Sequence, residues 1–430
     1  MAVGMKSKTL VFGSIYFAIL AAVTLAGIEV IATFFSPSWP AYALRSMPPV
    51  NSFPPGADLP AWMVAPFNSW GMRDRERAFA PAPAGTVRTV FVGDSFVEFQ
   101  PLRQSLPEAV EERILKQSKK TVEAVNFGIS GTNPQSYYYR LRDVALPLSP
   151  DAVSVFFFSG NDFLFDSNFR WEWLPPLLDE SPGRSIVGRV MPHTNWLLVN
   201  RLRLSEVLNS NEPIEGEFAT LQQIVKEPKE QGLTKLAQHM KRYYYPNVPE
   251  QKLREILARG DGRLFDLFAG RPDDQEYLAG WLPNLILRTE LTPTPFNSIT
   301  TLQQADAAIH ERVIDGTLSW LVAMYRLARE RNVPFSLFII PTGGVDPAFV
   351  DFWAPWPHYY SWYLHCDAMH ERLVQALRGT DVPFVDLRPT LAGRVDTYRK
   401  SDAHWTEYGQ SLAADRIAEQ IRNTLKAKLD

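Results

Sequence analysis

Short apolar runs alternate with longer amphipathic stretches over much of the chain. Five runs are rich in Val, Phe and Ile, and each stops at small or polar residues: 87–92, 122–127, 152–158, 335–340 and 383–387. Runs of this length are typical of strands buried on both faces of a sheet. The segments between them have helical spacing, as in 106–119, 133–146, 305–332 and 363–377. This alternation predicts an α/β fold with a parallel, doubly wound sheet.

Apolar residues also fill a segment near the N-terminus. Residues 9–28 carry no charge and are long enough to cross a bilayer, and Lys6 and Lys8 precede them. Lysines on that side favour a cytoplasmic N-terminus and an extracytoplasmic, periplasmic body. We therefore expect a cytoplasmic stub and transmembrane helix over 1–35, a single-pass anchor in the inner (cytoplasmic) membrane. A cleaved signal peptide and a buried helix of a soluble protein are the alternatives.

The remaining chain divides by composition. Residues 36–85 are rich in Pro and Ala and are predicted to be an extended linker. The α/β domain is expected over 86–169 and 301–430. Residues 170–300 break the strand–helix rhythm and are mostly helical in pattern, which indicates a large insertion. This insertion could serve as a lid, a substrate platform, a docking surface or a packing elaboration.

Charge and cysteine content exclude several classes of function. The net charge of the 430 residues is −3, so there is no basic field for nucleic acid. Cys366 is the single cysteine, which excludes an internal disulfide and a cysteine-based zinc site. His365 and His370 are five positions apart, a poor spacing for two ligands on one helix face. Neither a P-loop nor a Rossmann fingerprint is present, and we expect no metal and no cofactor.

The first run ends at Gly93-Asp94-Ser95, and Ser95 is the first candidate for chemistry. Ligands of open α/β sheets bind at the carboxyl ends of the strands. A serine at that place is a nucleophile if a base lies nearby. The alternative is an ordinary Asp/Ser cap of the following helix.

The other strand ends supply the partners that such a nucleophile needs. Gly131 follows the second run and offers a backbone N–H, and Asn161 follows the third and offers a side-chain amide. His404 follows the fifth run as a candidate base, and Asp402 is a candidate acceptor of its Nδ1–H. Taken singly, 160–162 fits a turn, and the Asp402–His404 pair fits a helix start.

Together these residues resemble the blocks of the SGNH (GDSL-type) hydrolase superfamily. The matching positions are Gly93-Asp94-Ser95, Gly131, Gly160-Asn161-Asp162, Asp402 and His404. The resemblance implies a flavodoxin-like three-layer α/β/α sandwich with five parallel strands. It also implies Ser95, His404 and Asp402 as catalytic residues, and an oxyanion hole from Ser95, Gly131 and Asn161. It covers roughly residues 68–165 and 305–425 and leaves the insertion outside.

The spacing of Asp402 and His404 departs from the usual motif and resembles one branch of the superfamily. Most members have Asp-x-x-His, whereas this chain has Asp402-x-His404. The shorter spacing is similar to bacterial polysaccharide O-acetyltransferases. It implies a serine esterase or O-acyltransferase that acts on ester groups, O-acetyl above all, of a carbohydrate, with a membrane protein as a further partner. The alternative is a non-catalytic scaffold or binding subunit of a membrane assembly.

Overall fold

The computed structural model describes much of the chain, in two compact units. The described residues are 2–35, 68, 72–78, 80–98, 102–163, 191, 193–194, 197–198, 217–273, 280–292, 295–400 and 403–430. One unit comprises 1–53, 66–77 and 171–212, and the other 54–65, 78–170 and 213–430. Most of the predicted linker, the first part of the predicted insertion and Asp402 lie outside the described residues.

A five-stranded parallel sheet forms the centre of the second unit. Its strands are β1 (Thr86–Gly93), β2 (Thr121–Gly128), β3 (Ala152–Phe158), β4 (Phe335–Ile340) and β5 (Phe384–Asp386). Their order is β2-β1-β3-β4-β5, and every pair is parallel. This is the flavodoxin-like order, in which the chain reverses direction across the sheet between β1 and β3. The predicted fold class is confirmed.

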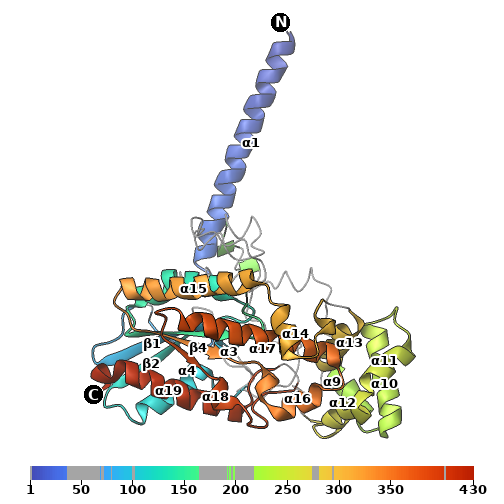
Figure 1. Ribbon diagram of the computed structural model, residues 1–430. Coiled ribbons are helices and arrows are strands. Elements are labelled where there is room, and N and C mark those ends of the chain that lie inside the picture. The colour runs from blue at the N-terminus through green and yellow to red at the C-terminus, as the bar shows by residue number, and fades with distance from the viewer. Residues whose placement is uncertain are drawn as a thin grey trace. The chain divides into compact units, whose positions relative to one another are not determined.

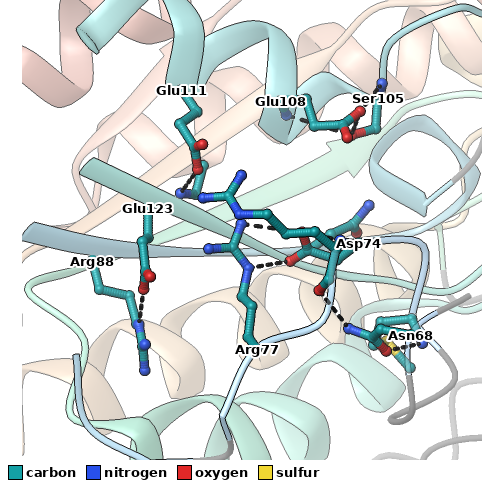
Figure 2. Close-up of polar contacts among 12 residues, drawn as sticks. Asn68, Asp74, Arg77, Arg88, Ser105, Glu108, Glu111 and Glu123 are labelled. Carbon is teal, nitrogen blue, oxygen red and sulfur yellow. Dashed lines mark hydrogen bonds and ion pairs between the residues drawn. The ribbon is translucent and has the colours of Figure 1, made fainter. Parts of the chain in front are cut away.

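Apolar burial and polar contacts fix the register of the first two strands. Val90, Phe91 and Val92 of the inner strand β1 are fully buried. Arg88 lies opposite Glu123 of β2, and the Arg88 Nε to Glu123 Oε2 distance is 2.7 Å (Figure 2). A slip of one residue would separate this pair and turn the side chains to the other face. On the edge strand β2, Glu111 accepts the Ala124 N–H at 2.7 Å.

Helices cover both faces of this sheet (Figure 1). On one face α4 (Leu106–Leu115) packs against β2 and against the C-terminal helix α19 (Glu407–Leu429). Ser105 and Glu108 form a reciprocal capping box at the start of α4 (Figure 2). On the other face α15 (Glu311–Glu330) packs against α5 (Pro134–Arg140), β4 and α17 (Pro357–Arg378). The result is a three-layer α/β/α arrangement.

Two predicted helices are divided in the structure. The segment 133–146 is α-helical only in α5, and a π-turn (Leu141–Ala145) and a 3-10 turn (Leu146–Leu148) follow. Pro147 has no N–H for a regular helical turn, which accounts for the change. The segment 305–332 comprises α14 (Leu302–Ala307) and α15. Ile309 lies in the break and packs against an apolar cluster of Ile299, Ala305, Leu364 and Ala368.

Helices make up most of the described chain between β3 and β4. They are α9 (Glu217–Ile224), α10 (Lys229–Tyr243), α11 (Glu250–Leu257), α12 (Arg259–Ala269) and α13 (Trp281–Leu291), followed by a 3-10 turn (Pro295–Ser298). After β4 come a 3-10 turn (Gly343–Val345) and α16 (Pro347–Trp353), and α18 (Arg388–Leu391) follows β5. The Trp356 Nε1–H donates to the Ile256 carbonyl at 2.9 Å, which joins the insertion to the start of α17.

The first unit contains the long helix α1 (Ala2–Thr33). Ile15–Thr33 is the one segment of the described chain that is apolar and long enough to cross a membrane. Near its end the Glu29 carboxylate accepts the backbone N–H groups of His193 and Thr194, at 2.7 and 3.0 Å. In the same unit Asp74 pairs with Arg77, Nε to Oδ2 at 2.8 Å (Figure 2).

Candidate active site

Ser95 lies beyond the carboxyl end of β1, two residues after the last residue of that strand. It is the first residue of the short helix α3 (Ser95–Glu98), one position after the buried Asp94. Asp94 is the cap of this helix, because its Oδ1 accepts the Phe96 N–H at 2.9 Å. Ser95 itself is half-buried, and its N–H has no acceptor within the helix that it begins. Its hydroxyl and its amide are therefore both available at the sheet edge.

The imidazole of His404 is hydrogen-bonded to this hydroxyl. The His404 Nε2 lies 2.8 Å from the Ser95 Oγ, although the two residues are 309 positions apart. The Asp94 Oδ2 is a second acceptor for the same hydroxyl, at 3.4 Å. A single proton serves one acceptor at a time, and the shorter distance favours the imidazole. This is the geometry of a nucleophile and its base.

A small hairpin carries His404 to this position. Tyr398 and Trp405 form an antiparallel bridge, and the Arg399 N–H donates to the His404 carbonyl at 2.7 Å. Ala403 completes the turn with a φ of +61°, which is left-handed backbone that a residue with a Cβ adopts at a cost of about 1–2 kcal/mol. The hairpin thus holds strained backbone next to the candidate base.

Aromatic packing fixes the imidazole plane. The Phe96 ring lies 4.9 Å from the His404 ring and 4.9 Å from the fully buried Trp405 ring, centroid to centroid. Phe96 also contacts Phe158 at the end of β3, at 4.4 Å. The residue after Ser95 therefore positions the base that faces Ser95.

Gly131 and Asn161 lie beyond the carboxyl ends of the two strands that flank β1. Gly131 has a φ of +71°, which requires glycine in practice, and a Cβ there would meet no atom within 4 Å. Asn161 is exposed, whereas Ser159 and Asp162 beside it are fully buried. Both residues are thus on the strand ends that the sheet brings to one edge, with open space around them.

A buried acid supports the Asn161 turn from the side of α5. The Asp162 Oδ2 accepts the Tyr137 hydroxyl at 2.8 Å and the Phe158 N–H at 2.7 Å. Burial, and then the nearby charge of Asp94, raise the pKa of Asp162 well above its ordinary value. Burial likewise raises the pKa of Asp94, against the opposing effects of the Phe96 N–H and His404.

A buried guanidinium connects the first two strand ends. Arg140 donates to the carbonyls of Gly93 and Phe127, at 2.9 and 2.6 Å, and to the Thr132 Oγ1 at 3.0 Å. Burial lowers its pKa to about 10, so it stays charged at neutral pH. Because Gly93 precedes Asp94-Ser95 and Thr132 follows Gly131, one side chain holds both segments in register.

The structure thus brings two of the predicted site residues, Ser95 and His404, into contact. It places Gly131 and Asn161 beyond the ends of β2 and β3, on either side of β1, and Asp402 lies outside the described residues. Sequence reasoning missed Tyr137 and Arg140, which no motif marks. The run Gly160-Asn161-Asp162 was a signal for Asp162, because it stands beside the candidate amide.

Comparison with known proteins agrees with this arrangement. Residues 360–430 match a family described as the SGNH hydrolase-like domain of the acetyltransferase AlgX. The matched residues include His404 but not Ser95. No curated protein matches the chain.

Two solved structures are similar at low identity. The lipase/acylhydrolase of Enterococcus faecalis is 12% identical with a TM-score of 0.33, over 78% of this chain and 96% of its own. A Bacteroides fragilis protein designated an acylhydrolase is 14% identical with a TM-score of 0.32, over 80% of this chain and 91% of its own.

The match of residues 360–430 to an SGNH hydrolase-like domain confirms the resemblance read from the sequence. Within that class, its C-terminal part is similar to the acetyltransferase AlgX.

Proposed function

We propose that this protein is a membrane-anchored, extracytoplasmic serine enzyme that cleaves or transfers acyl groups, O-acetyl above all, on a carbohydrate. The observation that carries the proposal is the 2.8 Å contact between the Ser95 Oγ and the His404 Nε2 at the edge of an α/β sheet. The match to an acetyltransferase domain supports the reaction class. The apolar segment Ile15–Thr33 supports the anchor, in the inner membrane with the body in the periplasm.

The first half of the proposed reaction forms an acyl-enzyme. The Ser95 Oγ attacks the ester carbonyl carbon while the His404 Nε2 takes the hydroxyl proton. The tetrahedral oxyanion accepts hydrogen bonds from the N–H groups of Ser95 and Gly131 and from the Asn161 amide. The carbon–oxygen bond to the leaving alcohol then breaks, and the alcohol departs with the proton held by His404. Asp402 is assigned to orient the His404 ring.

The second half transfers the acyl group to an acceptor. His404 removes a proton from water, for an esterase, or from a sugar hydroxyl, for an O-acyltransferase. The acceptor oxygen attacks the acyl carbon, and the Ser95 oxygen leaves with the proton from His404. Exclusion of water from the site decides between these acceptors.

Covalent labelling tests the nucleophile. The full chain, solubilised in detergent, is treated with a fluorophosphonate probe. We expect labelling of the wild type, its loss in Ser95→Ala, and its loss or severe slowing in His404→Gln. Ser118→Ala is the matched control, because Ser118 is half-buried like Ser95 and its hydroxyl donates to the Lys120 carbonyl instead. A folded wild type that takes no label contradicts the enzyme and favours a non-catalytic scaffold.

Product analysis tests the acceptor. Acetyl release from nitrophenyl acetate is followed with and without an oligosaccharide. Acetylated oligosaccharide indicates transfer, and free acetate alone indicates hydrolysis. Either product requires Ser95, so an active Ser95→Ala variant contradicts the proposed mechanism.

A further inference from the structure

The turn between β3 and the next segment is held at three of its four positions. Ser159, Gly160, Asn161 and Asp162 make up this turn, and Asn161 is its one exposed member. Asp162 is fixed by Tyr137 and by the Phe158 N–H. The other two anchors come from α17.

A serine, a histidine and an aspartate form the first of these anchors. The Ser159 Oγ lies 2.7 Å from the His370 Nδ1, and the His370 Nε2 lies 3.2 Å from the Asp386 Oδ1. Ser159 and His370 are fully buried and 211 positions apart. Asp386 is the last residue of β5, so the array joins the ends of β3 and β5 through α17.

The charge state of Asp386 fixes the direction of its hydrogen bond to His370. Burial acts to raise the pKa of Asp386, but the hydrogen bond and charge of His370, with the Arg388 N–H, outweigh it and lower the pKa. An ionised carboxylate only accepts, so the His370 Nε2–H donates to it. The His370 Nδ1 and the Ser159 Oγ form the second hydrogen bond of the ring, at 2.7 Å.

The second anchor is on the same face of α17. Cys366 lies one helical turn before His370, and its Sγ–H donates to the Gly160 carbonyl at 3.6 Å. The Ser159 N–H donates to the Ile340 carbonyl of β4 at 3.0 Å. The side chain and the backbone N–H of Ser159 therefore both form hydrogen bonds, whereas the Asn161 side chain is exposed.

This array has the residue types of a catalytic triad, but a substrate cannot reach its serine. Ser159 has no exposed surface, so no substrate reaches its hydroxyl. We propose instead that His370 is a positioning residue, which acts through Ser159 to hold the side-chain amide of Asn161 at the oxyanion position. This inference rests on the proposed function, because it assigns a role in the same reaction.

Kinetics of buried-hydroxyl variants test this role. Ser159→Ala removes the contact to His370, and we expect kcat on nitrophenyl acetate to fall about tenfold with KM unchanged, as for a small displacement of a catalytic group. Ser154→Ala is the matched control. Ser154 is a buried serine of β3, the strand that ends just before Ser159, and its Oγ has no hydrogen-bond partner among the described residues. Equal kcat values in the two variants overturn the inference.

Variants of His370 separate positioning from packing. His370→Leu fills the space without a hydrogen-bonding atom, and we expect a loss of kcat at least as large as in Ser159→Ala. His370→Asn places an amide group near the former Nδ1 and restores a hydrogen-bond partner for Ser159. Partial recovery of kcat in His370→Asn supports the inference, and equal losses in the two His370 variants contradict it.

A double-mutant cycle tests whether the effect passes through Asn161. Asn161→Ala removes the donor itself, for which a loss of about 100-fold is expected. If Ser159 acts only by way of Asn161, adding Ser159→Ala to that variant lowers kcat little further. Losses that multiply show that Ser159 acts by another route.

Hydrogen exchange tests the role of His370 independently of whether the protein is an enzyme. Exchange of peptides that cover 158–163 is measured in the full chain, and we expect faster exchange in Ser159→Ala than in Ser154→Ala. Full turnover by Ser95→Ala contradicts the proposed function and leaves this readout intact. Unchanged exchange at 158–163 contradicts the anchoring by His370, whatever the activity of the protein.

Discussion

The carboxylate of Asp346 accepts the backbone N–H of Thr397 at 2.7 Å across 51 positions of sequence. The same Oδ2 accepts the Tyr398 N–H at 3.0 Å, and the Oδ1 accepts the Ala348 N–H at 2.8 Å. One fully buried acid thus caps α16 and fixes the hairpin that ends at His404. The position of the candidate base therefore depends on a residue outside the hairpin that carries it.

Asp346→Asn should loosen that hairpin. An amide nitrogen at one of the two positions would face N–H donors in a buried site, so we expect a loss of about 2–3 kcal/mol in the free energy of unfolding. Slower fluorophosphonate labelling of Ser95 should accompany it. Thermal unfolding of the detergent-solubilised chain measures the first effect. Asp351→Asn, an exposed acid on the same helix, is the control, and equal behaviour of the two variants would contradict the anchoring role.

Asp162→Asn should change how stability depends on pH. The folded state raises the pKa of Asp162 well above its ordinary value, so it binds that proton more tightly than the unfolded state. Its contribution to stability is therefore greatest at low pH and falls as the pH rises from the ordinary aspartate range through the raised pKa. Asparagine keeps an acceptor for Tyr137 and Phe158 and does not ionise.

The variant should thus gain stability over the wild type as the pH rises from about 4 to about 8. Melting temperatures of both proteins over that interval measure the difference. Asp351→Asn serves again as the comparison and should follow the wild type. If the melting temperature of Asp162→Asn instead falls relative to that of the wild type as the pH rises, the expected pH dependence is contradicted.

Arg140→Lys should weaken the junction of β1 and β2. The guanidinium has acceptors at Gly93, Phe127 and Thr132, and a single ammonium group cannot reach all of them. We expect a loss of about 3 kcal/mol in stability and slower labelling of Ser95, because the Gly131 segment loses an anchor. The matched variant is Arg142→Lys, since Arg142 lies two residues further and pairs with its neighbour Asp143. Similar losses in both variants would refute a specific role for Arg140.

Local pattern was sufficient to predict the strands and to mark Ser95 and His404 as candidates that would meet. The runs that become β3 and β4 are buried along their whole length, and an uninterrupted apolar run shows that burial directly. The parallel arrangement then brings Ser95 and Asn161 to one edge from the strand order alone. The contact between Ser95 and His404 was expected for the same reason.

The support beneath these residues could not be predicted, because it depends on pairings distant in sequence. Nothing in the sequence near Arg140 indicates that its guanidinium faces the carbonyls of two strand ends. The contact of Ser159 with His370 needs the exact rotation of α17, which sequence periodicity gives only within a residue or two. The division of 305–332 into two helices likewise follows from tertiary packing at Ile309.

Two glycines at the end of β2 should respond very differently to alanine. At Gly131 a Cβ meets no atom within 4 Å, so Gly131→Ala bears only the cost of a φ of +71°, about 1 kcal/mol. At Gly128 a Cβ would lie 2.1 Å from the Glu98 N, so Gly128→Ala must separate β2 from α3. We expect a loss of about 3 kcal/mol there.

If Gly131 donates to the oxyanion, its alanine variant should stay folded yet label more slowly, because the methyl group enters the space that the acyl group occupies. Thermal unfolding and labelling rates of both variants decide this, and a Gly131→Ala protein that labels at the wild-type rate would remove Gly131 from the proposed oxyanion hole.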